Sequence, residues 1–86
     1  MNNTSDIYLE ITSPQKQVLG RMVGKVVLPG EKGQFSVLPG HAPLISSLLE
    51  GDIVYSEGDK EESLHIKSGF VEVRDNRVSV LSLIHI

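Results

Sequence analysis

Turn-forming residues recur so often along this chain that they leave little room for an ordinary helix. Ser13-Pro14, Pro29-Gly30, Pro39-Gly40 and Asp75-Asn76 are of this kind, and such signals return about every 8 to 12 residues. Between them apolar and polar residues alternate with period two, as in Ile7–Thr12, which is typical of a strand with one buried face. Because two sheets must cover each other's apolar faces, the pattern predicts an all-β sandwich or small barrel.

About eight short strands are expected. They are the apolar or alternating stretches between turn signals, namely Ile7–Thr12, Gln17–Leu28, Phe35–Leu38, Leu44–Leu49, Asp52–Ser56, Glu62–Lys67, Phe70–Arg74 and Arg77–Leu83. Gly20 and Gly24 predict bends or bulges in the long second stretch. Leu44–Leu49 also shows helical spacing, but it is about half an average helix in length, so a strand is favoured. Asp75-Asn76 predicts a two-residue hairpin loop with positive φ.

The composition indicates one small domain. The 86 residues are 40% hydrophobic and 22% charged, which suits a single core spanning 1–86, with 1–5 expected to be a frayed tail. With no cysteine, neither disulfides nor thiolate metal sites can hold the fold. A net charge of -3 without a Lys/Arg cluster argues against a nucleic-acid partner. No window approaches the roughly 18 apolar residues of a membrane helix, so direct membrane insertion is not expected.

The motifs of catalysis and cofactor binding are missing. His41, His65 and His85 lie too far apart for a metal site, and alternation places His65 on a solvated strand face. Gly30–Gly33 lacks the spacing and the helix of a phosphate loop, and Glu61-Glu62 should be solvated next to a hairpin tip. We therefore expect no catalytic residue, no metal and no cofactor.

Two other classes of function stay open alongside a structural one. A ligand- or carbohydrate-binding sandwich would show a concave aromatic face, which two Phe, two Tyr and no Trp do not favour. A small β-barrel enzyme would need a converging set of polar residues. The segment Leu38–Leu44, with two prolines and a glycine, is rigid, and it fits either a tight corner between sheets or a contact surface.

The stretch Gly33-Gln34-Phe35-Ser36-Val37-Leu38-Pro39-Gly40-His41-Ala42-Pro43-Leu44 closely resembles the signature of the ATP synthase epsilon family, Gly-Glu-Phe/Leu-Gly-(apolar)2-Pro-Gly-His-Ala-Pro-Leu. Further similarities follow in the family's order. They are Ser13-Pro14, Gly51, Ser68–Val73 and Asn76–Leu81, so the resemblance covers about residues 6 to 82.

The resemblance implies a flattened ten-stranded β-sandwich. It also implies a non-catalytic central-stalk subunit that couples gamma to the c-ring of a rotary proton- or sodium-translocating ATP synthase, for ATP synthesis. The expected partners are gamma and the c-ring within a hetero-oligomeric complex. The absence of a transit peptide favours a peripheral position on the cytoplasmic face of a bacterial inner membrane.

Two sets of positions carry over from the family. The c-ring-facing loop corresponds to Glu31, Lys32, Gly33, Gln34 and Phe35. The gamma-binding positions correspond to Ser13, Pro39, Gly40, His41, Ala42, Pro43, Leu44 and Ser46. Because docking would bury it, an exposed apolar patch is expected on the gamma-facing side.

The sequence departs from the family in two respects. Lys32 and Gln34 stand where acidic residues are common, and Ser36 stands where glycine is common, which predicts an altered charge-dependent contact with the ring. The chain also ends at Ile86, before the family's carboxy-terminal helical hairpin. Inhibition of ATP hydrolysis and ATP binding by that hairpin are therefore not transferred, and both a short natural member and a trimmed chain fit this length.

Overall fold

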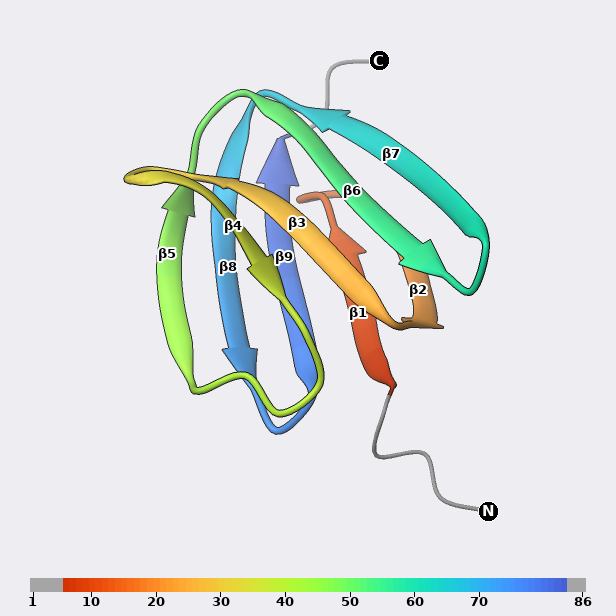
Figure 1. Ribbon diagram of the computed structural model, residues 1–86. Coiled ribbons are helices and arrows are strands. Elements are labelled where there is room, and N and C mark those ends of the chain that lie inside the picture. The colour runs from red at the N-terminus through yellow and green to blue at the C-terminus, as the bar shows by residue number, and fades with distance from the viewer. Residues whose placement is uncertain (1–5, 84–86) are drawn as a thin grey trace.

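The computed structural model describes residues 6–83, which form nine β-strands and contain no helix (Figure 1). The expected tail 1–5 and His85 lie outside the described residues. The strands are β1 (Ile7–Thr12), β2 (Gln17–Val23), β3 (Lys25–Gly30), β4 (Gly33–Val37), β5 (Leu44–Leu48), β6 (Gly51–Glu57), β7 (Lys60–Ile66), β8 (Ser68–Arg74) and β9 (Arg77–Leu83). The all-β fold is confirmed, and the ambiguous stretch Leu44–Leu49 contains the strand β5.

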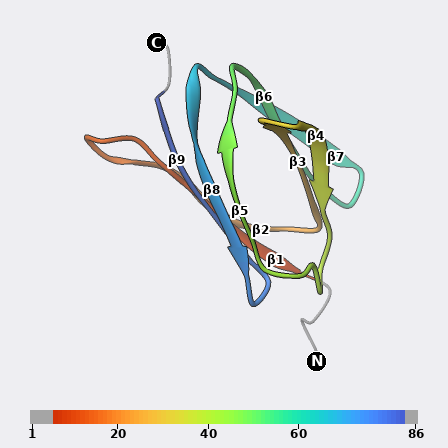
Figure 2. The same ribbon diagram turned by 90° about the vertical axis from the view of Figure 1, so that its left-hand side faces the viewer.

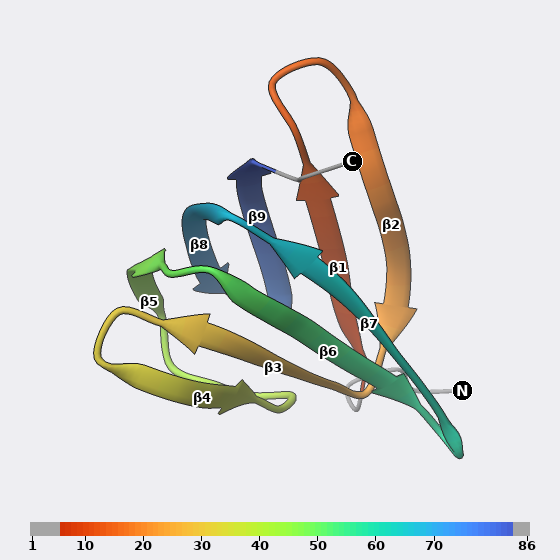
Figure 3. The same ribbon diagram turned by 90° about the horizontal axis from the view of Figure 1, so that it is seen from above.

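The strands form one hydrogen-bonded sheet that curls into two layers (Figures 2 and 3). One layer has the order β2-β1-β9-β8-β5, and the other contains β4-β3-β6-β7. They are joined where β3 reaches β5 through the pair Gly30 and Leu48. Two backbone bonds support this junction, from Leu49 N to Pro29 O at 2.9 Å and from Glu31 N to Ser47 O at 3.0 Å. The expected two-sheet sandwich is thus a single sheet folded over on itself.

Alternating apolar residues from both layers fill the space between them. In β1 the side chains of Ile7, Leu9 and Ile11 are fully buried, while their neighbours are half-buried. β3 and β6 follow the same rule with Val26, Leu28, Ile53 and Tyr55. Burial of each large aliphatic side chain stabilises the fold by about 1.5–3 kcal/mol, so this core is the main source of stability.

The two glycines in the long second stretch behave differently. The chain passes between layers at Gly24, whose amide donates to Ser56 O at 2.8 Å, and this splits the stretch into β2 and β3 as the prediction allowed. The bend expected at Gly20 is wrong, because Gly20 pairs regularly with Glu10. A Cβ at Gly20 would lie 2.6 Å from the Tyr8 hydroxyl oxygen. Gly20 therefore leaves room for the Tyr8 hydroxyl and the Gln17 side chain.

Pro29-Gly30 was expected to end a strand, yet both residues belong to β3. Gly30 and Gly33 flank a two-residue turn and form a hydrogen-bonded pair, so the next pair, Pro29 and Gln34, is one that exchanges no backbone bonds. The missing N–H of Pro29 therefore costs β3 no bond to β4.

Two hairpin turns in the second half of the chain are tight. Asp75 and Asn76 have φ of 52° and 58°, which confirms the predicted positive-φ turn between β8 and β9. The β6–β7 loop is shorter than the five polar residues expected, because Glu57 pairs with Lys60 and leaves Gly58 and Asp59 as the turn. Gly58 has φ 62°, which a glycine adopts without strain.

Arg21 connects the edge of one layer to the acidic β6–β7 hairpin of the other. Its guanidinium lies 3.5 Å from Oε1 of both Glu57 and Glu62, and 5.8 Å from the centroid of the Tyr55 ring. Burial and the hydrogen bond to Glu62 raise the pKa of Tyr55. These groups are partly exposed, so they add only modestly to stability, but they align β2 with β6.

Candidate functional site

The rigid segment before β5 is built around a tight turn. The amide of His41 donates to Leu38 O at 3.1 Å, and Gly40 has φ 84°. Proline second and a positive-φ glycine third describe a type II turn, in which only glycine or asparagine is comfortable at the third position. The turn presents Ala42 and Pro43 to solvent and leaves His41 half-buried, with its Nδ1 2.6 Å from Ala42 O.

The other predicted segment is the turn between β3 and β4. Glu31 and Lys32 form the turn itself, while Gly33, Gln34 and Phe35 are the first residues of β4. Gly33 has φ 125°, a backbone conformation reserved for glycine. The Phe35 ring packs against the core, and a Cβ at Gly30 would lie 2.8 Å from it. The turn therefore exposes Glu31, Lys32 and Gln34 and anchors them through Phe35.

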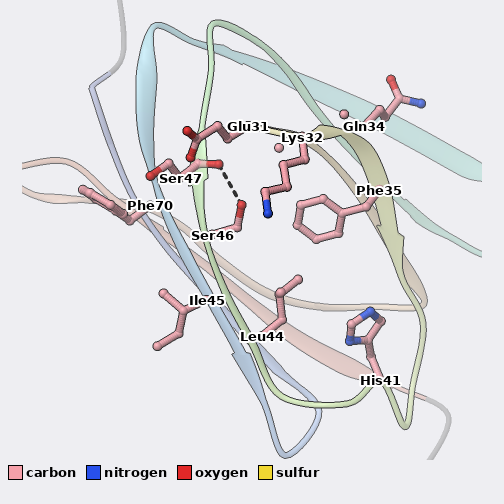
Figure 4. A pocket seen from close by; sticks show the side chains of 12 residues that line it. Glu31, Lys32, Gln34, Phe35, His41, Leu44, Ile45, Ser46, Ser47 and Phe70 are labelled. Atoms are coloured by element: carbon pink, nitrogen blue, oxygen red, sulfur yellow. Dashed lines mark hydrogen bonds between the residues drawn. The ribbon is translucent and has the colours of Figure 1, made fainter.

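The two predicted sets meet in an open cleft of about 700 Å³ between this turn and β5 (Figure 4). Lys32 extends from the turn into the cleft towards Ser46, and Phe35 and Leu44 provide apolar walls. Ser46 Oγ donates to Ser47 O at 2.9 Å. All five residues predicted to face the c-ring line this cleft. Three of the positions predicted to face gamma do so as well: His41, Leu44 and Ser46.

The other predicted positions lie outside the cleft. Pro39, Gly40, Ala42 and Pro43 belong to the turn before β5 and its exit, and Ser13 lies in the β1–β2 turn. The hydroxyl and amide of Ser13 are both bonded locally to the backbone of Lys16, at 3.2 and 2.8 Å. Ser13 is thus a turn residue at the opposite edge of the same layer.

Four large apolar side chains are exposed on the outer face of the three strands β5, β8 and β9. We call them the outer patch: Ile45, Phe70, Leu81 and Leu83, which are 74%, 59%, 53% and 54% exposed. Phe70 and Leu81 are direct cross-strand partners. An exposed apolar patch is therefore present as expected, although its residues were not named from the sequence; that it faces gamma stays a prediction. A signal existed, since Phe70 and Leu81 are apolar at the strand positions that alternate with buried Val71 and Val80.

The surface of the outer patch is hollowed on both sides of Phe70. A depression of about 400 Å³ lies towards β1 and is lined by Thr12, Ile45 and Leu81 among others. A second, of about 390 Å³, reaches Pro14 at the β1–β2 turn. The outer patch is therefore bordered by the β1–β2 turn on one side and by β5 on the other. These two borders contain Ser13 and Ser46.

His65 lies in an exposed charged cluster on the other layer. Its Nδ1 is 2.7 Å from Asp52 Oδ1, and its Nε2 is 3.2 Å from Glu50 Oε2. The solvated strand-face position expected for His65 is consistent with a side chain 52% exposed. The hydrogen bond to Asp52, followed by that to Glu50, raises the pKa of His65 above its usual value near 6.5.

Asp52→Asn is expected to lower the pKa of His65 towards that of a free histidine. Protonated His65 contributes its whole share of the free energy of unfolding at pH values below the pKa it has in the unfolded chain. That contribution is lost as pH rises through its pKa in the folded chain. An NMR titration of the His65 ring protons measures this pKa in the wild type and in Asp52→Asn. The ring protons of His41 in the same spectra are the control. Identical His65 titration midpoints in the wild type and Asp52→Asn would contradict the contact.

Residues 6–83 contain neither a metal-binding group nor a membrane-spanning helix. No three His, Asp or Glu side chains in this part of the chain form a group that could hold a metal ion. The same residues contain no helix of the length and apolar character needed to cross a membrane.

Comparison with known proteins identifies the family. Residues 6–84 match the model of the ATP synthase delta/epsilon chain, beta-sandwich domain. The chain is 42% identical over 76 residues to the ATP synthase epsilon chain of Nitratidesulfovibrio vulgaris, covering 88% of this chain and 57% of that one. It is 46% identical over 74 residues to that of Desulfitobacterium hafniense, covering 86% and 56%. The chain thus spans a little over half the length of these relatives.

Solved structures share the fold. A chain of the Euglena gracilis mitochondrial ATP synthase structure (OSCP/F1/c-ring) superposes with a TM-score of 0.90 at 24% identity, over 100% of this chain and 56% of that one. A chain of the Tetrahymena thermophila central stalk/c-ring structure gives 0.75 at 12% identity, over 90% and 63%. The sandwich, the signature around Pro39-Gly40-His41 and the match over nearly the whole length agree, and the chain belongs to the family of ATP synthase delta/epsilon chain beta-sandwich domains.

Proposed function

We propose that this chain is a non-catalytic central-stalk subunit that couples gamma to the c-ring of a rotary ATP synthase. The observation that carries the proposal is the outer patch. It leaves Ile45 74% and Phe70 59% exposed on a domain of this size, and side chains of this kind gathered on one face mark a docking surface. The resemblance to the epsilon family implies gamma as the partner that covers it.

The borders of the outer patch support gamma as its occupant. The resemblance assigns Ser13 and Ser46 to the gamma contact; Ser13 lies in the β1–β2 turn and Ser46 on β5, the two elements that border the outer patch. A partner that spans these two elements would cover the outer patch. Its apolar side chains would fill the two hollows beside Phe70, which suits an aromatic anchor at the centre of an interface.

The contact with the c-ring would use the β3–β4 turn. Glu31 and Lys32 are exposed at its tip, and their formal charges cancel. A turn of this kind favours a ring loop that carries both charges or none, in contrast to the acidic turn common in the family. Phe35, which packs against the core, anchors the base of this turn.

This contact would place the subunit at the membrane without inserting it. The ring, rather than this chain, spans the bilayer. The compared epsilon chains come from bacteria, which supports a peripheral position on the cytoplasmic face of the inner membrane. No bond-forming chemistry is assigned to any residue of this chain.

Titration of the purified chain with gamma, the latter supplied as an F1 complex stripped of its own epsilon, tests the proposal. One chain should bind per gamma, and the chain alone should hydrolyse no ATP. Detergent-solubilised c-ring should then bind the gamma-bound chain more tightly than gamma alone. A chain that binds neither gamma nor the ring would refute the proposed role.

A further inference from the structure

A side chain from a distant turn holds the backbone of the Pro39-Gly40-His41 segment. Asn76 lies in the β8–β9 turn, 36 residues beyond Gly40, and its Oδ1 accepts a hydrogen bond from the Gly40 amide at 2.7 Å. The family signature includes Gly40 but not Asn76. The hydrogen bond joins the segment before β5 to the hairpin turn between β8 and β9.

The Gly40 amide is available for this bond because the turn does not use it. In a type II turn the closing bond runs from the fourth residue to the first, here from His41 N to Leu38 O. The amide of the third residue, Gly40, is left over. Asn76 supplies its acceptor and so attaches the turn to the sheet at a second point, which restricts rotation of the whole turn.

Asn76 is itself held in place. Its φ of 58° belongs to the tight hairpin turn, and its carbonyl accepts the Tyr8 amide at 3.0 Å, which ties the turn to β1. The pair Arg74 and Arg77 closes the hairpin beneath it. A side chain mounted on such a turn has little freedom, so it can define the position of the group to which it bonds.

We propose that Asn76 is a positioning residue that sets the orientation of the Leu38–His41 turn for recognition of gamma. The inference rests on the proposed function and deepens it. The turn carries His41, which is half-buried at the lower end of the cleft (Figure 4), with its ring nitrogen against Ala42 O. A turn that pivots would move His41 and Pro43, two of the positions predicted to bind gamma, relative to β5.

Asn76 meets two requirements at once, and they can be separated by substitution. Positive φ is tolerated by Asn, Asp and Gly, whereas the acceptor oxygen is provided by Asn and Asp alone. Asn76→Gly therefore keeps a turn of the favoured Asp-Gly type and removes only the bond to Gly40. Asn76→Asp keeps both properties and is the matched control.

The test measures Gly40 amide hydrogen exchange by NMR and the affinity for gamma in F1 stripped of its own epsilon. Asn76→Gly should speed Gly40 exchange about tenfold and weaken gamma binding roughly five- to tenfold, the effect of one lost hydrogen bond. Asn76→Asp should stay within about twofold of the wild type in both. Thermal unfolding confirms that each variant folds.

The inference is overturned by unchanged Gly40 exchange in Asn76→Gly, and equally by an Asn76→Asp chain that behaves like Asn76→Gly. Unchanged gamma affinity of Asn76→Gly alongside faster Gly40 exchange would also overturn it, because the bond from Asn76 would then hold the turn without affecting binding. If the wild type does not bind gamma, the proposed function fails and recognition fails with it. Gly40 exchange needs no partner and separately decides whether Asn76 holds the turn.

Discussion

Replacing Phe70 with aspartate is expected to weaken binding to gamma by roughly 30- to 1,000-fold, or about 2–4 kcal/mol, while the sandwich stays folded. The Phe70 ring is 59% exposed and borders both hollows of the outer patch, so in a complex it would fill the centre of the interface. A carboxylate at that point would be buried without a partner, which adds the cost of desolvation to the lost apolar contact. Calorimetric titration with gamma in F1 stripped of its own epsilon measures the effect.

Met22→Asp provides the matched control. Met22 is 42% exposed on β2, the edge strand of the same layer, and lies outside the outer patch. It should change the affinity for gamma by less than about twofold. If Phe70→Asp bound as tightly as the wild type, or if both variants lost affinity equally, the outer patch would not be the gamma surface.

Leu28→Ala should destabilise the fold by about 3 kcal/mol, since it removes a fully buried side chain and leaves a cavity. Leu28 lies on β3, the strand that connects the two layers, and contributes to the core between them. An 86-residue domain has a total stability of roughly 4–13 kcal/mol. A loss of this size would lower the melting temperature by roughly 10–25 °C, as measured by circular dichroism.

Leu49→Ala is the appropriate comparison for Leu28→Ala. The residue type is the same, but Leu49 is 52% exposed in the β5–β6 turn. Its truncation should change the free energy of unfolding by no more than about 0.5 kcal/mol. Equal effects of the two substitutions would mean that the core is not where the structure places it.

The fold class and most strand positions could be predicted because they depend on local signals. Period-two alternation is visible in Ile7–Thr12, and Asp75-Asn76 has the composition of a hairpin turn, which its φ values confirm. The connection of both layers into one sheet could not be predicted. It rests on the pairing of Gly30 with Leu48, and nothing in the sequence near either residue specifies that partner.

The errors at Gly20 and Pro29 have a shared cause. Each residue was interpreted from its own conformational preference, whereas its neighbour across the sheet decides the outcome. Gly20 is regular because it pairs with Glu10 in the β1–β2 ladder, and Pro29 is tolerated because its pair with Gln34 exchanges no backbone bonds. Cross-strand register is a long-range property, so a reading along the chain misses it.

The candidate site was partly accessible from the sequence. The resemblance supplied Lys32, His41 and Ser46, and the structure brings these three into one cleft. The outer patch and the bond from Asn76 to Gly40 were missed, because they join β5 and its preceding turn to β8, β9 and the turn between them. The apolar patch was expected only because the domain is small and should dock on a partner, and that argument does not say which residues form the patch.

The footprint of gamma on the chain tests the central claim most directly. The wild-type sequence has no cysteine, so single thiols can be introduced by Ile45→Cys in the outer patch and by Glu61→Cys on β7 of the opposite layer. Both positions are exposed in the free chain and should react with a maleimide at similar rates. In complex with gamma, the thiol at 45 should be protected at least tenfold and the thiol at 61 should react as before. Protection at 61 with free reaction at 45 would contradict the account.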